Sequence, residues 1–376
     1  MATINYLTTV QLDHGAIKLL SAELHRLGIH RPLIVTDKGI RAAGILDKVL
    51  ESLGDTVAFS IYEDTPPNPT EAAVVAATKM FVRSECDGII AIGGGSSIDL
   101  GKATALLATH PDPLQTYAAV EGGASRISER VAPLVAIPTT AGTGSEVGRG
   151  SVIVMNSGRK LGLLSPFLLP KVAICDPDLT LGLPPMLTAA TGMDAIAHCI
   201  ETFLAPAINP PAEAIALDGL RRGMDNIKKA TRDGSDRDAR WNMMVAAMEG
   251  ALAFQKGLGA VHALSHPLGA VPGVSLHHGT LNAVLLPAVL RFNKSVTESK
   301  QAALVQSMGL AVGADPAEHI ELLNSRIGMP RGLGAMGVPR SVLADIAAAA
   351  MKDHCHATNP RVATVDDYRQ MLEESY

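Results

Sequence analysis

Apolar and β-branched residues form short runs in the first half of the chain, and these runs alternate with stretches of helical periodicity. One such stretch is Ile40–Leu53, and Thr70 can cap a further helix that Glu71 opens. Strands that alternate with helices predict a mostly parallel α/β sheet. The runs that we expect to be strands are Pro32–Thr36, Thr56–Tyr62, Gly88–Ile92, Leu134–Ile137, Val152–Met155 and Val172–Cys175.

In the second half the pattern changes to long alanine- and leucine-rich stretches without convincing strands. The Leu183-Pro184-Pro185 step forces an extended connection between the two patterns. We therefore predict an α/β domain over residues 1–183 and an all-helical domain over residues 184–376. The stretches that we expect to be helices include Leu187–Leu204, Pro211–Ala230, Asp236–Phe254 and Thr280–Phe292.

The composition agrees with two globular domains. The chain has 376 residues, more than the roughly 250 to 300 at which one hydrophobic core stops growing. Of these residues 47% are hydrophobic and 18% are charged, which is typical of a protein with a large buried fraction. A formal net charge of −5 and an aromatic content of 3% disfavour nucleic acid and an anionic membrane surface as partners.

The sequence predicts neither export nor a membrane anchor. The first twenty residues do not combine a basic segment with an apolar one, and no run of eighteen apolar residues follows. The four cysteines, at positions 86, 175, 199 and 355, form no CxxC pair, as suits reduced thiols. We therefore expect a cytoplasmic protein.

A predicted strand runs into three glycines, Gly93–Gly95, and then into a helical pattern. Glycine lets the backbone approach a ligand closely, and the first amides of a helix favour an anion, so this loop is a candidate phosphate site. It matches neither common fingerprint. Ile98 stands where GxGxxG has its third glycine, and Ser96 and Ala103 replace required residues of the Walker loop. The other interpretation is a tight turn that binds nothing.

A second loop favours the phosphate site. Pro138–Glu146 also follows a predicted strand, and it combines clustered hydroxyl groups with two glycines. Two such loops indicate one crevice at the carboxyl edge of a sheet. Asp37, at the end of the first predicted strand, can accept hydrogen bonds from an adenosine ribose and disfavours a 2′-phosphate. We therefore expect NAD rather than NADP.

Carboxylate and imidazole side chains recur at helical spacing in the second half. Asp194 and His198 lie at i and i+4, so they share one helix face. His262 and His266 repeat this spacing, and the adjacent pair His277–His278 follows. Singly, these residues could be a surface ion pair, a core histidine or a helix cap. Together they predict a divalent metal site, and a carboxylate with three imidazoles suits Fe(II), Zn(II), Co(II) or Ni(II).

Several segments between about Asp37 and Phe292 together resemble the iron-containing (group III) alcohol dehydrogenase family. They are GGGSSIDLGK, PTTAGTGSE, DPDLTLGLPP, TAATGMDAIAHCIE, GLGAVHALSHPLG and HHGTLNAVLLP. The resemblance implies a Rossmann-like α/β domain, a helical domain and the dehydroquinate-synthase-like architecture. It also implies a metal-dependent alcohol dehydrogenase that uses NAD and Fe(II) or Zn(II) on a small alcohol or aldehyde, and we expect a homodimer.

The family's functional positions can be matched to this chain one by one. Its metal ligands fall on Asp194, His198, His262 and His278. The interval before the His-Gly pair is slightly longer than usual, so His277 stays the alternative to His278. His266 matches a further family histidine near the substrate, and we expect it to take part in proton transfer. The family's cofactor contacts fall on Asp37, Asn68, Gly94, Gly95, Ser96, Asp99, Thr139, Thr140, Ser145 and Lys160.

Within the family, segments such as Tyr6-Leu7-Thr8, Ala253–Gly259 and Asn359-Pro360-Arg361 look most like bacterial 4-hydroxybutyrate dehydrogenases. This resemblance implies interconversion of 4-hydroxybutyrate and succinic semialdehyde, with a cation near the substrate carboxylate. Arg149 and Lys256 are the candidates, because each is close in sequence to a motif that lines the cleft.

Other functions stay open as alternatives. They are a broader primary-alcohol oxidoreductase, a metal-free reductase of the maleylacetate type, a lyase of the dehydroquinate-synthase type that retains its NAD, and a nucleotide-binding scaffold without activity. Asp194 and the His-Gly pair speak against the metal-free reductase, and a scaffold has no use for the metal residues.

Overall fold

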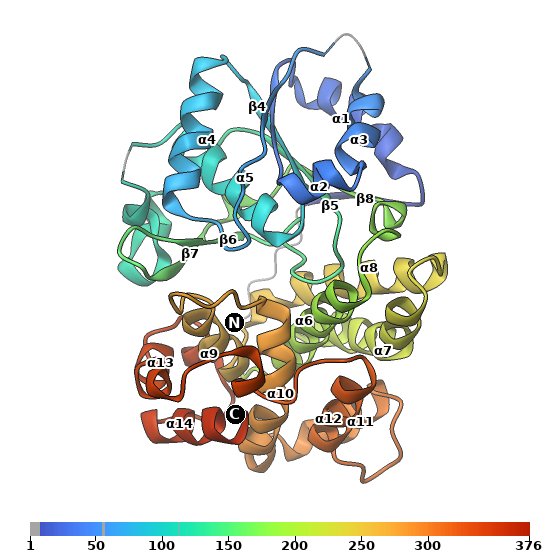
Figure 1. The fold of residues 1–376 in the computed structure, drawn as a ribbon, viewed down its shortest axis with the longest axis vertical. Helices are drawn as coiled ribbons and strands as arrows, with labels where there is room; N and C mark the ends of the chain where they lie inside the picture. Colours follow the sequence, from blue (N-terminus) through green and yellow to red (C-terminus); the bar gives the residue numbers. More distant parts are fainter. Residues whose placement is uncertain (1–7, 55–56, 112) are drawn as a thin grey trace. The chain divides into compact units, whose positions relative to one another are not determined.

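The computed structural model describes residues 8–54, 57–111 and 113–376. These residues form two compact units, one of residues 8–140 and 144–182 and the other of residues 141–143 and 183–376. The first unit is α/β and the second is helical (Figure 1), so the predicted fold class is confirmed. Two predicted features, the Tyr6-Leu7 step and the start of the Thr56–Tyr62 run, lie outside the described residues.

A six-stranded sheet forms the centre of the α/β unit, with the strand order β1-β8-β5-β4-β2-β3. All its paired strands are parallel, as the alternation of strands and helices predicted. The strands are β1 (Thr9–Leu12), β2 (Pro32–Val35), β3 (Ser60–Tyr62), β4 (Gly88–Gly93), β5 (Leu134–Pro138) and β8 (Val172–Cys175). Parallel strands place their carboxyl ends along one edge, where ligands bind in such sheets.

Helices cover both faces of this sheet, which is why its strands are apolar at successive positions instead of alternating. Ile34 and Ile90 pack on the face that carries α1 and α3. Leu33 and Ile89 pack on the opposite face with α4 and α5. The helices of this unit are α1 (Leu20–Leu27), α2 (Lys38–Ala42), α3 (Ile45–Leu53), α4 (Glu71–Arg83) and α5 (Gly95–Leu107). The cap at Thr70 is confirmed, because its side chain accepts a hydrogen bond from the Ala73 amide.

Two predictions in this unit were wrong. The single helix expected over Ile40–Leu53 is divided into α2 and α3, because Gly44 takes a left-handed φ of 70° between them. The Val152–Met155 run does not join the parallel sheet. It belongs to β6 (Gly150–Val154), which forms a separate antiparallel hairpin with β7 (Lys160–Leu164), a strand that was not predicted.

Helix α6 (Pro185–Leu204) lies at the centre of the helical unit, where it packs against α7, α8 and α10. Every residue from Thr188 to Leu204 is buried, so no face of this part of the helix is open to solvent. The other helices are α7 (Pro210–Arg232), α8 (Arg237–Ala253), α9 (Ala260–Leu268), α10 (His278–Asn293), α11 (Glu298–Ser307), α12 (Pro316–Arg326), α13 (Leu343–Ala350) and α14 (Val365–Glu374). The four predicted helical stretches correspond to α6, α7, α8 and α10. No helix in the described part of the chain combines the length and the apolar character needed to cross a membrane.

Candidate active site

One carboxylate and three imidazoles meet in the helical unit. Asp194 and His198 are one turn apart on α6, His262 lies in the first turn of α9, and His278 is the first residue of α10. The Oδ1 atom of Asp194 lies 3.9 Å from Nε2 of His198, 3.8 Å from Nε2 of His262 and 3.6 Å from Nε2 of His278. Asp194, His198 and His262 are buried, whereas the His278 side chain is 23% exposed. The structure therefore brings together the four residues that the sequence singled out.

The spacing of these atoms fits a metal ion. In a tetrahedral site with bonds of about 2.1 Å, the ligand atoms lie about 3.4 Å apart, close to the distances seen here. The side-chain nitrogen of Asn282 lies 2.6 Å from Asp194 Oδ1 and 3.2 Å from Nε2 of both His262 and His278. The NH2 group of Asn282 thus lies where three acceptor atoms converge, namely Asp194 Oδ1 and the Nε2 atoms of His262 and His278. One carboxylate and three imidazoles are ligands that suit a divalent cation.

The structure also separates the two adjacent histidines. His278 points toward Asp194, whereas His277 precedes α10 as its N-cap residue and is exposed. Gly279 allows this close approach of α10 to α6, because a Cβ atom there would lie 2.1 Å from the carbonyl oxygen of Ala190. The geometry therefore favours His278 as the fourth ligand.

Burial and charge set the protonation of the two innermost imidazoles. Burial lowers the pKa of His198 to about 4, although the Asp194 carboxylate acts in the opposite direction. Burial would also lower the pKa of His262, but the Glu201 carboxylate outweighs it and raises the pKa overall. His198 is therefore neutral near pH 7, and a neutral imidazole is the form that binds a metal.

Sequence reasoning missed Glu201, which lies behind His262. The Glu201 carboxylate is buried on α6 and accepts hydrogen bonds from Nδ1 of His262 and, across 2.8 Å, from the amide of Val261. Asp194, His198 and Glu201 lie at i, i+4 and i+7, so all three share one face of α6. This spacing was the signal in the sequence that could have revealed Glu201.

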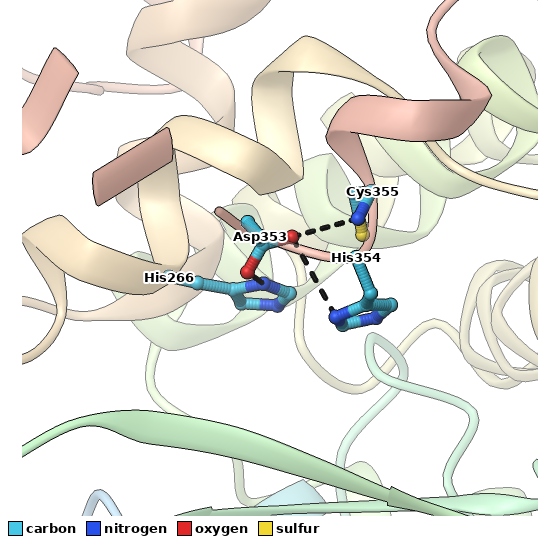
Figure 2. A group of neighbouring side chains, drawn as sticks. All are labelled: His266, Asp353, His354 and Cys355. Carbon is cyan, nitrogen blue, oxygen red and sulfur yellow. Dashed lines mark hydrogen bonds and ion pairs between the residues drawn. The ribbon is translucent and has the colours of Figure 1, made fainter. Parts of the chain in front are cut away.

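A second group of side chains surrounds His266 (Figure 2). Its Nδ1 atom lies 2.9 Å from Oδ2 of Asp353. The other oxygen of Asp353 accepts a hydrogen bond of 2.8 Å from the Cys355 amide and lies 3.6 Å from Nδ1 of His354. The His266 ring is near-parallel to the rings of His278 and His354, with centroids 5.6 and 5.5 Å away. The Asp353 carboxylate thus contacts all three neighbours: the rings of His266 and His354 and the backbone amide of Cys355.

These side chains form a hydrogen-bonded cluster around Asp353, and burial and charge set their protonation. Burial raises the pKa of the Cys355 thiol well above its usual value, so it is not a thiolate. Burial lowers the pKa of His354 to about 4. Burial would raise the pKa of Asp353, but His266 beside it lowers the pKa overall, so this carboxylate stays charged. A charged carboxylate accepts hydrogen bonds only, and it therefore takes the hydrogen that His266 carries on Nδ1.

In the α/β unit, the first glycine loop has the features of a phosphate site. Helix α5 begins at Gly95, and its N-cap residue Gly94 provides no side-chain cap, so the first amides of the helix can serve an anion. A Cβ atom at Gly94 would lie 3.2 Å from Oγ1 of Thr140 on the next loop. Asp37 follows β2, and its carboxylate accepts hydrogen bonds from the Ile40 amide and, across 3.2 Å, from Ser97. This part of the predicted cofactor set lies after β2, β4 and β5, at their carboxyl ends.

The remaining predicted cofactor residues bond within the unit. Asp99 is buried and accepts hydrogen bonds from Ser145, across 2.6 Å, and from the Val152 amide, across 2.9 Å. These bonds join α5 to the second loop and to β6. Lys160 Nζ donates a hydrogen bond of 3.0 Å to Asn68 Oδ1. The Ser96 hydroxyl donates to the Pro67 carbonyl, and the Thr139 amide donates to the Gly93 carbonyl across 3.0 Å.

The two substrate candidates have different surroundings. Arg149 is exposed just before β6. Lys256 is buried, and its ammonium group donates to the carbonyls of Thr202 and Phe203 at the end of α6 and lies 3.2 Å from Glu213. The structure does not place Lys256 with the metal-site histidines. Because its hydrogens already have partners, this arrangement disfavours a role in binding the substrate, and that role stays a prediction to be tested.

Comparisons with known proteins show the family of the chain. A family model described as iron-containing alcohol dehydrogenase matches residues 8–177, and the model of the C-terminal part of that family matches residues 188–376. The chain therefore belongs to the iron-containing alcohol dehydrogenase family. It is an oxidoreductase of the alcohol dehydrogenase class, as its motifs predicted.

Among its relatives, the 4-hydroxybutyrate dehydrogenase of Cupriavidus necator is 56% identical over 382 residues, which cover 100% of both chains. The 1,3-propanediol dehydrogenase of Klebsiella pneumoniae is 36% identical over 96% of this chain and 95% of that enzyme. A crystal structure of 1,3-propanediol oxidoreductase matches with a TM-score of 0.94 and 34% identity over 100% of both chains. A sulfoacetaldehyde reductase from Bifidobacterium kashiwanohense in complex with NAD+ matches with a TM-score of 0.90 and 28% identity, over 100% of this chain and 98% of that one.

Proposed function

We propose that the chain interconverts 4-hydroxybutyrate and succinic semialdehyde with NAD, at a divalent metal ion held by Asp194, His198, His262 and His278. The observation that carries the proposal is the convergence of Asp194 Oδ1 with three imidazole Nε2 atoms at 3.6 to 3.9 Å. The choice of substrate is supported by the relative from Cupriavidus necator, whose name states this substrate and which matches the whole chain.

The donor set suits the chemistry. Bound Fe(II) or Zn(II) supplies Lewis-acid stabilisation to an alcohol oxygen that loses its proton. Asp194 is the one carboxylate among the four, and with three neutral imidazoles it leaves a divalent ion net positive, as this stabilisation requires. His266 is the residue that we assign to exchange the alcohol proton, because Asp353 occupies its Nδ1 and leaves Nε2 as the reactive ring nitrogen.

The cofactor proposal rests on the α/β unit. Bound NAD would supply the hydride acceptor, and its pyrophosphate would bind at the start of α5, where Gly94 and Gly95 leave the amides accessible. The negative charge of Asp37 favours NAD over NADP. We assign Asn68, Ser96, Thr139, Thr140 and Lys160 to the same site, with Asp99 and Ser145 fixing its loops. The homodimer and the cytoplasmic location stay predictions.

One panel of assays tests the proposal. The protein is stripped of metal, refilled with Fe(II) or Zn(II), and assayed with NAD and NADP on 4-hydroxybutyrate, 1,3-propanediol, ethanol and lactaldehyde. We expect the highest kcat/KM for 4-hydroxybutyrate with NAD, one NADH per alcohol, and no activity before refilling. Equal efficiency with ethanol would indicate a broad alcohol dehydrogenase. Full activity without metal would indicate the maleylacetate type, and no released NADH would indicate the lyase.

Two variants test the metal ligands. Asp194→Ala should lose both the bound metal and the activity. Asp225→Ala removes an exposed carboxylate from α7 and should retain both. If Asp194→Ala binds metal as tightly as the unchanged protein, this ligand set is wrong.

A further inference from the structure

Two side chains from other parts of the chain hold the start of helix α9. Gly259 is its N-cap residue and provides no side-chain cap. Asn359 Oδ1 accepts a hydrogen bond of 3.0 Å from the Ala260 amide, and Glu201 Oε1 accepts one of 2.8 Å from the Val261 amide. The positive end of the helix dipole stabilises the Glu201 carboxylate at this position.

The second oxygen of the same carboxylate reaches the histidine of the next residue. Glu201 Oε2 is the hydrogen-bond partner of Nδ1 of His262. Because a carboxylate can only accept, Nδ1 carries the hydrogen and Nε2 presents its lone pair. That Nε2 atom is the one that lies 3.8 Å from Asp194 Oδ1. One carboxylate thus fixes the position of the helix, the tautomer of the ring and the direction of its lone pair.

The packing leaves Glu201 little freedom to move. Its side chain is 4% exposed. A Cβ atom at Gly259 would lie 2.9 Å from Glu201 Oε1 and 2.7 Å from Asn359 Oδ1, so only a glycine lets the backbone pass this close. The orientation of His262 is therefore set before a metal ion arrives.

We propose that Glu201 is a positioning residue of the metal site, which fixes the orientation of the His262 ring and the nitrogen that faces the ion, and so raises the affinity for the ion. This inference rests on the proposed function, because it takes His262 as a ligand. Outer carboxylates that hold a ligating histidine typically contribute 10- to 100-fold to metal affinity or activity. Glu201 contacts His262 and the start of α9, so we expect its effect to pass through the ion.

The chain provides a matched control on the same helix. His266 follows His262 by one turn, and Asp353 holds its Nδ1 at 2.9 Å as Glu201 holds that of His262. His266 is not among the proposed ligands. Removing the charge of Asp353 therefore changes the same kind of bond without changing a ligand.

The experiment measures metal binding directly. Zn(II) affinity is determined by competition with a chelator, and Co(II) absorption reports the geometry of the site, on the full chain of Glu201→Gln, Asp353→Asn and His262→Ala. In Glu201→Gln the amide oxygen can still accept from Val261 while its NH2 faces Nδ1, which shifts the ring hydrogen to Nε2. We expect about 10- to 100-fold weaker Zn(II) binding and an altered Co(II) spectrum. Asp353→Asn should leave both unchanged.

The outcomes are separable. If His262→Ala binds Zn(II) as tightly as the unchanged protein, the proposed metal site is wrong. If His262→Ala loses the metal but Glu201→Gln stays within about twofold, the role of Glu201 is refuted while the metal site stands. Circular dichroism of the metal-free proteins checks folding. If Glu201→Gln does not fold, Glu201→Asp decides, because the shorter side chain keeps the charge but draws the carboxylate away from Nδ1 of His262. Unchanged affinity together with an unchanged Co(II) spectrum there would overturn the inference.

Discussion

Nδ1 of His266 donates a hydrogen bond to Oδ2 of Asp353 across 2.9 Å, and the two residues are 87 positions apart in the chain. The bond fixes both the orientation of the ring and its tautomer, as carboxylates do for catalytic histidines elsewhere. His266 comes from α9, whereas Asp353 lies in the segment after α13. A proton-transfer role for His266 therefore depends on a residue that is distant along the chain but adjacent in the folded helical unit.

Asp353→Asn should lower kcat by about tenfold or more, because the asparagine NH2 can turn toward Nδ1 and reverse the tautomer of His266. The KM for NAD and the metal content should not change. Steady-state kinetics together with metal analysis checks both. Asp345→Asn, at an exposed carboxylate on α13, is the control and should behave as the unchanged enzyme. A fall in metal content that matches the fall in kcat would contradict this prediction.

Lys256→Met should destabilise the protein rather than impair recognition of the acid. The ammonium caps carbonyls at the end of α6 and pairs with Glu213, and hydrogen bonds to charged groups contribute about 1.5 to 3 kcal/mol each. We expect unfolding in urea to show a loss of about 2 kcal/mol or more, with the KM for 4-hydroxybutyrate within about twofold.

Arg149→Ala provides the contrasting result. Its side chain is exposed, so stability should change little, whereas the KM for 4-hydroxybutyrate should rise far more than that for 1,3-propanediol. Equal increases for both substrates would remove Arg149 as the partner of the carboxylate. A selective increase in Lys256→Met would instead restore the original expectation for that lysine.

Helical spacing explains which site residues the sequence could reveal. Asp194 and His198 are one turn apart, so their shared face follows from the period of an α-helix. Glu201 and His262 are 61 positions apart, and no local pattern reports their contact. Lys256 shows the opposite limit of the sequence, since it adjoins a site motif in the chain although its side chain extends to the end of α6. Proximity in sequence does not give the direction of a side chain.

The fold was predictable where burial dominates. β4 is buried along its whole length, and its apolar run marked it as a strand. β1 is an edge strand that pairs only with β8 and is partly exposed, so its composition carries little signal. β7 was missed for a related reason, because four of its five residues are glycine or leucine and its pairing depends on a turn at Gly158, with φ of 78°. Such features depend on tertiary pairing and backbone conformation.

Gly279→Ala should weaken metal binding without altering a ligand. A Cβ atom there would lie 2.1 Å from the Ala190 carbonyl oxygen and 3.2 Å from Cβ of Asp194, so α10 must shift away from α6 and carry His278 with it. We expect at least about tenfold weaker Zn(II) binding, measured by chelator competition. Gly182→Ala, where nothing lies within 4 Å of the added atom, should bind Zn(II) normally. Unchanged affinity in Gly279→Ala would exclude a dependence on this close approach.

Asp37→Asn should shift the cofactor preference toward NADP. The asparagine oxygen can still accept from the Ile40 amide and keep the cap of α2, while the charge that opposes a 2′-phosphate is removed. We expect the ratio of kcat/KM for NADP to that for NAD to rise by roughly tenfold, equivalent to about 1.4 kcal/mol. Asp47→Asn, at an exposed position on α3, should leave the ratio unchanged. If the Asp37→Asn ratio is also unchanged, Asp37 does not face the adenosine ribose.

Glu249 on α8 should make the stability of the protein depend on pH. Burial, and to a lesser extent the neighbouring Asp218, raises the pKa of Glu249 from its ordinary value of 4.5 to about 8. Asp218 itself stays charged, because it accepts hydrogen bonds from Arg221 and Arg222 at 2.6 and 2.7 Å. Between pH 4.5 and 8 the folded chain therefore holds a proton on Glu249 that the unfolded chain has released, so a rise in pH favours unfolding.

Glu249→Gln removes the titrating carboxyl group, so this proton no longer contributes to the pH dependence of stability. The glutamine keeps an amide that can donate to Asp218. The variant should match the unchanged protein near pH 5 and should become progressively more stable than it up to about pH 8, above which the difference should level off. Urea unfolding at pH 5, 6.5 and 8 measures this difference, and Glu129→Gln, at an exposed position, should show none. A difference that is constant over this range would show that Glu249 is ionised at pH 5 in the folded protein and would refute the raised pKa.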